Sequence, residues 1–153
     1  MEAALGSEFI EADLFHSPGN VEKMREGRGL TDADRGPWLH AVCRAALDCP
    51  SRPVVIACSA LKRSYRDLIR ARLGTVRLVF LDGTRELIST RLSGRKGHFA
   101  SVSLLDSQLD TLERPGLGEA PIVLDIALPL DALVATTIRH LSAKPSSDGT
   151  LVL

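Results

Sequence analysis

Short apolar runs alternate with longer amphipathic segments along the whole chain. The runs at 54–58 and 76–81 contain few polar residues, "PIVLDI" at 121–126 is similar, and "EFIEA" at 8–12 is a shorter candidate. Runs of this kind are typical of strands that are covered on both faces, as in a parallel sheet. Because helical segments separate them, the pattern predicts an α/β protein with a mostly parallel sheet.

The segments between these runs have apolar residues at helical spacing and recognisable starting residues. Thr31, followed three positions later by Asp34, resembles a capping box, with Asp where Glu is usual. Gly74 ends the helix expected over about 61–73. We expect helices to begin near Ser17–Pro18, Thr31, residue 61, Thr84, Ser103 and Pro129.

The length of 153 residues fits one domain with a substantial core. We assign the domain to residues 1–142. The remaining residues, 143–153, are rich in Ser, Pro, Gly and Asp, and we expect them to form a flexible tail.

Charge and cysteine content narrow the class of protein further. Lys plus Arg and Asp plus Glu are both 19, so no net charge points to nucleic acid or to a membrane surface as a partner. Neither a transmembrane run nor a signal-peptide pattern is evident. The three cysteines have no CxxC spacing, so we expect reduced thiols, no zinc site and a cytoplasmic location.

Polar residues that could carry chemistry follow the first strand and open the second helix. "EADLFH" places Glu11, Asp13 and His16 just beyond the strand at 8–12. Asp13 could orient a substrate hydroxyl or a magnesium-bound water, although a capping role is the alternative. Arg35 has no such structural role, and a guanidinium suits a substrate carboxylate.

A basic segment later in the chain predicts a phosphate-binding lid. "RLSGRKGHF" contains Arg91, Arg95, Lys96 and His98, interrupted by glycines. A basic run is usually a solvated surface, but glycines at this spacing suit a mobile loop that closes over phosphates. Together these signals indicate a kinase for a small, anionic, hydroxylated substrate.

Several longer stretches resemble the gluconokinase family of the thermoresistant bacterial type. The stretches are "DLFHSPGNVEKM", "GRGLTDADRGPWL", "ACSALKRSYRDLIR", "RKGHF" and "LLDSQLDTLE". The resemblance covers about residues 5–141 and implies the three-layer P-loop kinase fold that shikimate kinase also has. It implies phosphorylation of D-gluconate by ATP with Mg²⁺ to 6-phosphogluconate, and a possible homodimer.

The resemblance also implies residue roles. Asp13 matches the carboxylate that partners the acceptor hydroxyl. Arg91 and Arg95 match a catalytic lid over about 91–112 that screens charge on the transferred phosphoryl group. The substrate-binding residues implied in this way are His16, Asn20, Arg35, Ser59, Lys62, Tyr65, Arg66 and His98.

One expected motif is absent from the sequence. The family begins with a strand and a Walker A loop, G-x-x-x-x-G-K-S/T, and no such sequence occurs here. By the size of half a βαβ unit, about 20 to 30 residues are missing before Met1. In this fold the missing strand is central, so we expect the strands at 54–58 and 76–81 to lack a partner, and the 153-residue chain to be inactive.

Three interpretations remain open, with a fourth concerning the substrate. The chain could be a gluconokinase whose sequence begins at an internal Met. It could be a non-catalytic gluconate-binding or regulatory remnant, or a decayed product without a stable fold. A kinase for another small hydroxy acid is a further alternative.

Overall fold

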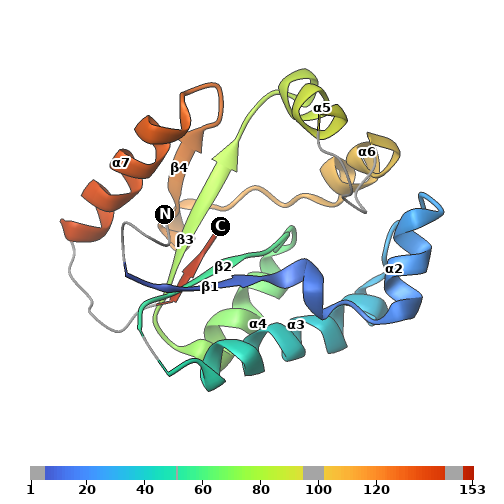
Figure 1. Ribbon diagram of the computed structural model, residues 1–153, viewed down its shortest axis with the longest axis horizontal. Helices are drawn as coiled ribbons and strands as arrows, with labels where there is room; N and C mark the ends of the chain where they lie inside the picture. Colours follow the sequence, from blue (N-terminus) through green and yellow to red (C-terminus); the bar gives the residue numbers. More distant parts are fainter. Residues whose placement is uncertain (1–5, 51, 95–101, 144–149) are drawn as a thin grey trace.

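The structure is a computed structural model that describes residues 6–50, 52–94, 102–143 and 150–153. Strands and helices alternate along the chain, as the sequence pattern predicts (Figure 1). The elements are β1 Glu8–Glu11, the 3-10 helix η1 Ala12–Phe15, α2 Pro18–Arg25, α3 Asp32–Asp48, β2 Val54–Ala57, α4 Arg63–Leu73, β3 Val76–Asp82, α5 Arg85–Ser93, α6 Val102–Thr111, the 3-10 helix η2 Leu117–Glu119, β4 Ile122–Asp125, α7 Leu130–Ser142 and β5 Thr150–Val152.

The five strands form one sheet in the order β1-β2-β5-β3-β4, and every neighbouring pair is parallel. The prediction of an α/β protein with a parallel sheet is therefore confirmed. Parallel neighbours need crossover connections, and the helices between the strands supply them. Among the described residues, no helix is both long enough and apolar enough to cross a membrane.

β5 is the main departure from the sequence-based expectation. We expected a flexible tail over 143–153 and two buried strands without a partner. Instead Thr150–Val152 lies between β2 and β3 and pairs with both, with Thr150 opposite Val54 on one side and Val76 on the other. The expectation was wrong because the apolar signal of this strand is only three or so residues long and follows a polar segment; residues 144–149 lie outside the described part.

Alternate strand residues build two cores on opposite faces of the sheet. Val54, Ile56 and Val152 pack with α3 and α4 on one face. Val55 and Leu151 pack with α7 on the other. This alternation follows the period of two along a strand, and it gives three layers (Figure 1). β5 thus contributes to both cores.

Helix α3 is fixed at its start and against β1. Its capping box is present as predicted: Asp34 N–H donates to Thr31 Oγ1 at 3.2 Å, and Thr31 N–H donates to Asp34 Oδ2 at 3.0 Å. Further along, the buried Trp38 donates from Nε1 to the Ala12 carbonyl at 2.7 Å. These contacts hold the first turn of α3 beside the segment that follows β1.

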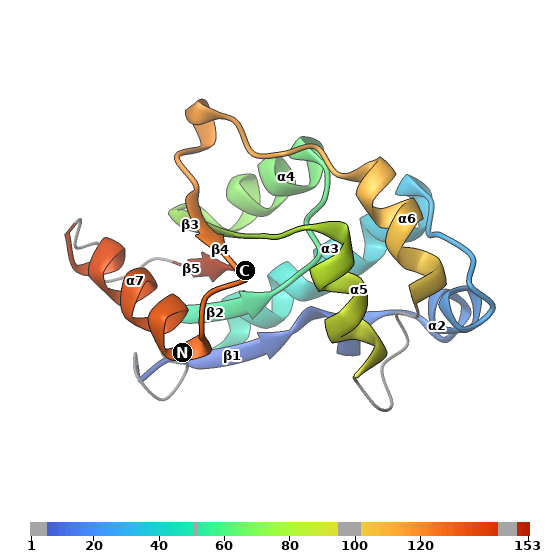
Figure 2. The same ribbon diagram turned by 90° about the horizontal axis from the view of Figure 1, so that it is seen from above.

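Helices α5 and α6 lie side by side, away from the covered faces of the sheet (Figures 1 and 2). They follow the carboxyl end of β3 and stand across from α2. Residues of α5 and α6 line a pocket together with residues at the carboxyl ends of β1 and β2.

Candidate functional site

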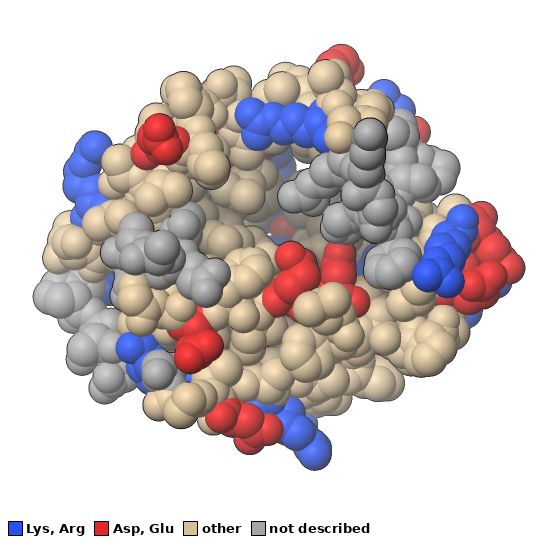
Figure 3. All heavy atoms as spheres, viewed as in Figure 1, with Lys and Arg blue, Asp and Glu red and all other residues tan. Residues whose placement is uncertain are grey.

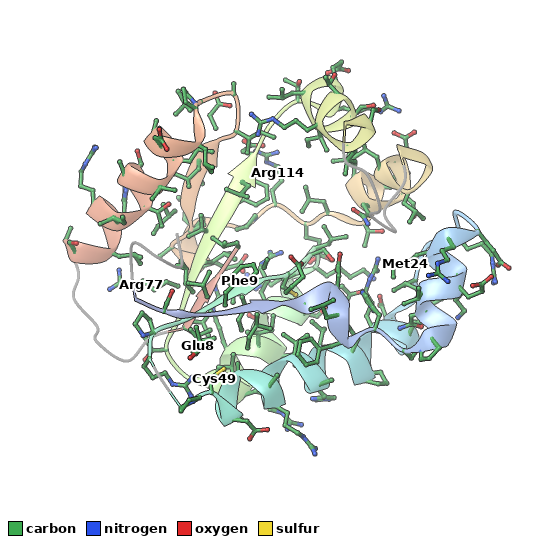
Figure 4. The ribbon with its side chains drawn as sticks, viewed as in Figure 1. Glu8, Phe9, Met24, Cys49, Arg77 and Arg114 are labelled. Atoms are coloured by element: carbon green, nitrogen blue, oxygen red, sulfur yellow. The ribbon has the colours of Figure 1, made fainter. Side chains whose placement is uncertain are left out.

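A pocket of about 280 Å³ lies beyond the carboxyl ends of β1 and β2, where open α/β sheets bind their ligands. The view in Figure 3 shows the molecule hollowed near its middle, with acidic side chains at the lower edge of the hollow. Met24 of α2, labelled in Figure 4, lies at one side of the pocket, and α5 and α6 contribute the other side. The lining residues are Glu11, Asp13, His16, Met24, Arg28, Gly29, Leu30, Arg35, Ala57, Cys58, Ser59, Leu92, Leu104, Ser107 and Gln108.

His16 is held at the pocket by Trp38. The two rings stack with centroids 4.4 Å apart and planes 15° from parallel. His16 Nε2 lies 3.9 Å from Asp13 Oδ1, while the buried Nδ1 has no hydrogen-bond partner among the described residues. Burial lowers the pKa of His16, and the Arg35 charge adds to this, although Asp13 acts in the opposite direction. The ring is therefore neutral at neutral pH, with one buried nitrogen unsatisfied.

Arg35 brings a positive charge to the same pocket from the first turns of α3. It is 8 % exposed. Its Nη1 donates to the Tyr65 hydroxyl at 3.4 Å, and its Cζ lies 5.7 Å from the centroid of the Tyr65 ring. A guanidinium carries five N–H donors, so most of its donors are not used by this contact.

Lys62 and Tyr65 contact Asp32 rather than lining the pocket. Lys62 Nζ lies 2.8 Å from both carboxylate oxygens of Asp32, and the Tyr65 hydroxyl donates to Asp32 Oδ1. The hydrogen bond from Lys62 is the main reason that the pKa of Asp32 lies below its ordinary value. These two predicted substrate residues therefore do not line the pocket, although Tyr65 contacts Arg35, which does.

Arg66 is paired with a buried carboxylate, outside the pocket. Its Nε and Nη2 donate to the two oxygens of Glu119 at 2.6 and 2.9 Å, and its Nη1 donates to the carbonyls of Ala60 and Leu61. Both side chains of the pair are 3–4 % exposed, and Arg70 also reaches Glu119. The Arg66 hydrogen bond is the main cause that lowers the pKa of Glu119 to about 2. The pair fixes the segment that carries Ser59 into the pocket.

The remaining predicted residues have separate placements. Asn20 is buried and donates from Nδ2 to the Asp34 carbonyl at 3.0 Å, which ties α2 to α3. Arg91 donates to the carbonyl of Ile126. Arg95 and His98 lie outside the described residues. Of the predicted set, the structure brings together Asp13, His16, Arg35 and Ser59.

Sequence reasoning placed α6 within the lid expected over about 91–112, but it named no residue of α6 as a lining residue of the pocket. Ser107 and Gln108 line it, and a Cβ placed on Gly29 would lie only 2.7 Å from Ser107 Oγ. α6 therefore packs closely on the loop between α2 and α3. A signal was present, because Gln108 is a polar residue among the leucines of an otherwise apolar helix stripe.

A second, mostly apolar pocket of about 190 Å³ lies between the end of β3 and α6. Arg114, labelled in Figure 4, lies beside it, with its guanidinium 5.1 Å from the centre of the Phe80 ring and paired with Asp82. Within the described ranges, no group of three or more His, Cys, Asp or Glu could hold a metal ion.

Two known proteins that are similar to this chain are gluconokinases. The thermoresistant gluconokinase of Escherichia coli is 41% identical over 138 residues, which are 88% of this chain and 79% of that protein. A gluconokinase of Gluconobacter oxydans is 43% identical over 143 residues, covering 92% of this chain and 80% of that protein. This chain belongs to the gluconokinase family.

Solved structures agree with membership of the gluconokinase family. The unliganded structure of a sugar kinase from Janibacter has a TM-score of 0.84 and 44% identity, covering 94% of this chain and 84% of that one. A gluconokinase from Sinorhizobium meliloti has a TM-score of 0.82 and 43% identity, covering 93% and 81%. No family model matches the chain.

Proposed function

We propose that this domain serves the ATP-dependent phosphorylation of D-gluconate to 6-phosphogluconate, and that the pocket beyond β1 and β2 binds gluconate. Its relatives are gluconokinases. The observation that carries the proposal is that a cation, an imidazole ring and a carboxylate line one small pocket: Arg35, His16 and Asp13. The volume of about 280 Å³ lies just below the range that holds drug-sized ligands, so it suits a small molecule.

Arg35 supports an acid as the substrate. A buried guanidinium with unused donors is poorly solvated, and a carboxylate that accepts two parallel N–H bonds satisfies it. A neutral sugar offers hydroxyls but no charge. We therefore assign the carboxylate end of gluconate to Arg35.

His16 and Asp13 support a polyhydroxylated substrate. His16 lines the pocket beside Asp13, and a neutral imidazole can exchange a hydrogen bond with a substrate hydroxyl. Asp13 is partly exposed within the same pocket, where its carboxylate can accept the proton of the attacking hydroxyl. We assign Asp13 to the acceptor hydroxyl.

The described residues do not form a site for ATP and Mg²⁺, which the family implies. The sequence contains no Walker A motif to cradle phosphates. Among the described residues, no group of three or more His, Cys, Asp or Glu could hold a metal ion. The central strand position, which the resemblance assigns to the strand before that loop, is held by β5. No step of the reaction is therefore assigned to nucleotide-binding residues of this chain.

These observations favour a second candidate function for the 153-residue chain, which is gluconate binding without phosphoryl transfer. Positioning of the nucleotide phosphates supplies most of the catalysis in kinases. A coupled assay for ADP release with Mg-ATP and gluconate separates the two functions, with the E. coli relative as positive control. Turnover above the blank supports the kinase; binding without turnover supports the second candidate.

Trp38 provides a direct test of the proposed substrate. It is the one Trp in the sequence and stacks on His16, so its fluorescence reports on the pocket. Titration with D-gluconate should change the emission, and titration with D-glucose should give a much weaker response. Arg35→Ala should weaken gluconate binding about tenfold or more, the scale of a hydrogen-bonded charge.

Arg72→Ala is the matched control, because Arg72 is an exposed arginine near the end of α4 that does not line the pocket. Its gluconate affinity should equal that of the unaltered chain. Equal responses to gluconate and glucose, or an unaffected Arg35→Ala variant, would contradict the assignment.

A further inference from the structure

Asp32 is the first residue of α3, and it does not itself line the pocket. In the structure, Asp34 forms the capping box of α3 with Thr31. The carboxylate of Asp32 contacts Lys62 and Tyr65 instead. The Asp32 side chain is 64 % exposed, so it is not needed to fill the core.

The direction of these hydrogen bonds is fixed by chemistry. An ionised carboxylate only accepts, and Tyr65 has a single hydroxyl proton, so Tyr65 donates to Asp32. The Tyr65 oxygen is then left to accept from Arg35, which can only donate. Asp32 therefore sets the orientation of the Tyr65 hydroxyl that Arg35 contacts.

Two positive charges lie near the Tyr65 ring, and Asp32 forms an ion pair with one of them. Lys62 Nζ and Arg35 Cζ lie 5.8 and 5.7 Å from the centroid of the Tyr65 ring. Lys62 is paired with Asp32 at 2.8 Å, whereas Arg35 contacts the neutral phenol and lines the pocket. Asp32 is thus paired with Lys62, while Arg35 is the residue of the two that lines the pocket.

We propose that Asp32 is a positioning residue for the acid end of the substrate: it orients the Tyr65 hydroxyl, which in turn orients Arg35. The proposal rests on the proposed function and adds to it a residue that determines preference for a carboxylate.

The first test does not involve the substrate. Tyr65 is the one tyrosine of the sequence, so the absorbance of ionised phenol during an alkaline titration reports its pKa alone. Burial and the hydrogen bond to Asp32 raise this pKa, while Arg35 lowers it. Asp32→Asn should therefore lower the Tyr65 pKa. An unchanged titration overturns the proposed contact.

The second test is a double-mutant cycle on gluconate affinity, measured by Trp38 fluorescence. Asp32→Asn and Tyr65→Phe should each weaken binding about tenfold, the scale of hydrogen bonds to charged groups. Because Asp32 acts through Tyr65, the double variant should bind about as well as Tyr65→Phe alone. Multiplicative effects of the two changes, or unchanged or tighter binding by Asp32→Asn, overturn the proposal.

Asp67→Asn is the matched control. Asp67 is another exposed aspartate, on α4, and pairs with Arg63 and Arg70 rather than with residues of the pocket. Its gluconate affinity and its Tyr65 titration should match those of the unaltered chain, and all variants should keep the same melting temperature. If the unaltered chain does not bind gluconate, the proposed function fails; if it binds and Asp32→Asn is unaffected, only the present inference fails.

Discussion

His16 combines three features that seldom occur in one side chain: it is buried, it stacks on the single tryptophan, and one of its nitrogens has no described partner. Burial disfavours the charged ring, which is why the pKa of His16 lies below its ordinary value. Such an environment suits a group that exchanges hydrogen bonds with a ligand rather than one that carries charge.

The lowered pKa of His16 makes stability depend on pH. The unfolded chain takes up a proton near the ordinary value of 6.5, before the folded chain does, so acidification favours unfolding. The free energy of unfolding should begin to fall as the pH is lowered through the ordinary value of 6.5, and it should go on falling until the folded chain is protonated as well. Urea unfolding followed by Trp38 fluorescence measures this change.

His16→Gln should remove most of this pH dependence, while His40→Gln, at an exposed position of α3, should retain it. An identical slope in both variants would show that His16 is not the group responsible.

At the residue scale, the predicted residues that line the pocket are those that directly follow strands or open a helix. Asp13 and Ser59 follow β1 and β2, and Arg35 lies in the first turn of α3, so their positions follow from topology. Which residues pair with one another could not be read in this way. Arg66 contacts Glu119, which lies 53 positions further along the chain, and no local sequence pattern predicts a contact over that separation.

The contact between Arg66 and Glu119 matters at the scale of elements. It joins α4 to η2, and through the carbonyls of Ala60 and Leu61 it also holds the segment after β2. A buried ion pair is costly to break by removing one partner, because the other charge is left uncompensated.

Glu119→Gln should therefore lower the free energy of unfolding by about 3 kcal/mol near neutral pH. The pKa of Glu119 is about 2 when folded, against an ordinary value of 4.5. The unaltered chain and Glu119→Gln should differ in free energy of unfolding by a constant amount above about pH 5. Below that pH the difference should shrink, because Glu119 takes up a proton in the unfolded chain before it does so in the folded chain. Urea unfolding across this pH range measures the effect. Glu86→Gln, on the surface of α5, is the control and should leave the free energy of unfolding nearly unchanged. A comparable loss in Glu86→Gln would contradict the special role of the pair formed by Arg66 and Glu119.

β5 is the element on which continuity of the sheet depends. It contributes ladder hydrogen bonds to β2 and β3, and its side chains Leu151 and Val152 enter the two cores. Without it, several buried backbone groups would be unsatisfied at about 1 to 3 kcal/mol each, against a total stability of about 5 to 15 kcal/mol.

Deleting residues 150–153 should abolish the cooperative thermal transition, measured by circular dichroism. Leu151→Ala, at a buried position, should retain the transition but cost about 2 to 5 kcal/mol. Val123→Ala, at an exposed position of β4, should change stability by less than about 0.5 kcal/mol. A normal transition in the shortened chain would mean that β5 does not hold the two halves of the sheet together.

At the scale of the whole molecule, the alternation of apolar runs predicted the parallel α/β fold and nearly all of its elements. It did not predict that a strand from the end of the chain would lie at the centre of the sheet. Periodicity reports how a segment is buried, and three residues such as Thr150–Val152 are too few to show a period. Strand order depends on long-range pairing, which a single sequence does not display.

The central claim is that this gluconokinase-family chain recognises the carboxylate of a sugar acid through Arg35. Calorimetric titration of the 153-residue chain with D-gluconate and with D-gluconamide, its neutral amide, tests this claim most directly, because the two ligands differ only at the acid group. The account predicts that gluconate binds at least about tenfold more tightly, the scale of one charge-assisted contact. Equal affinities for the two ligands, or no binding of gluconate, would contradict it.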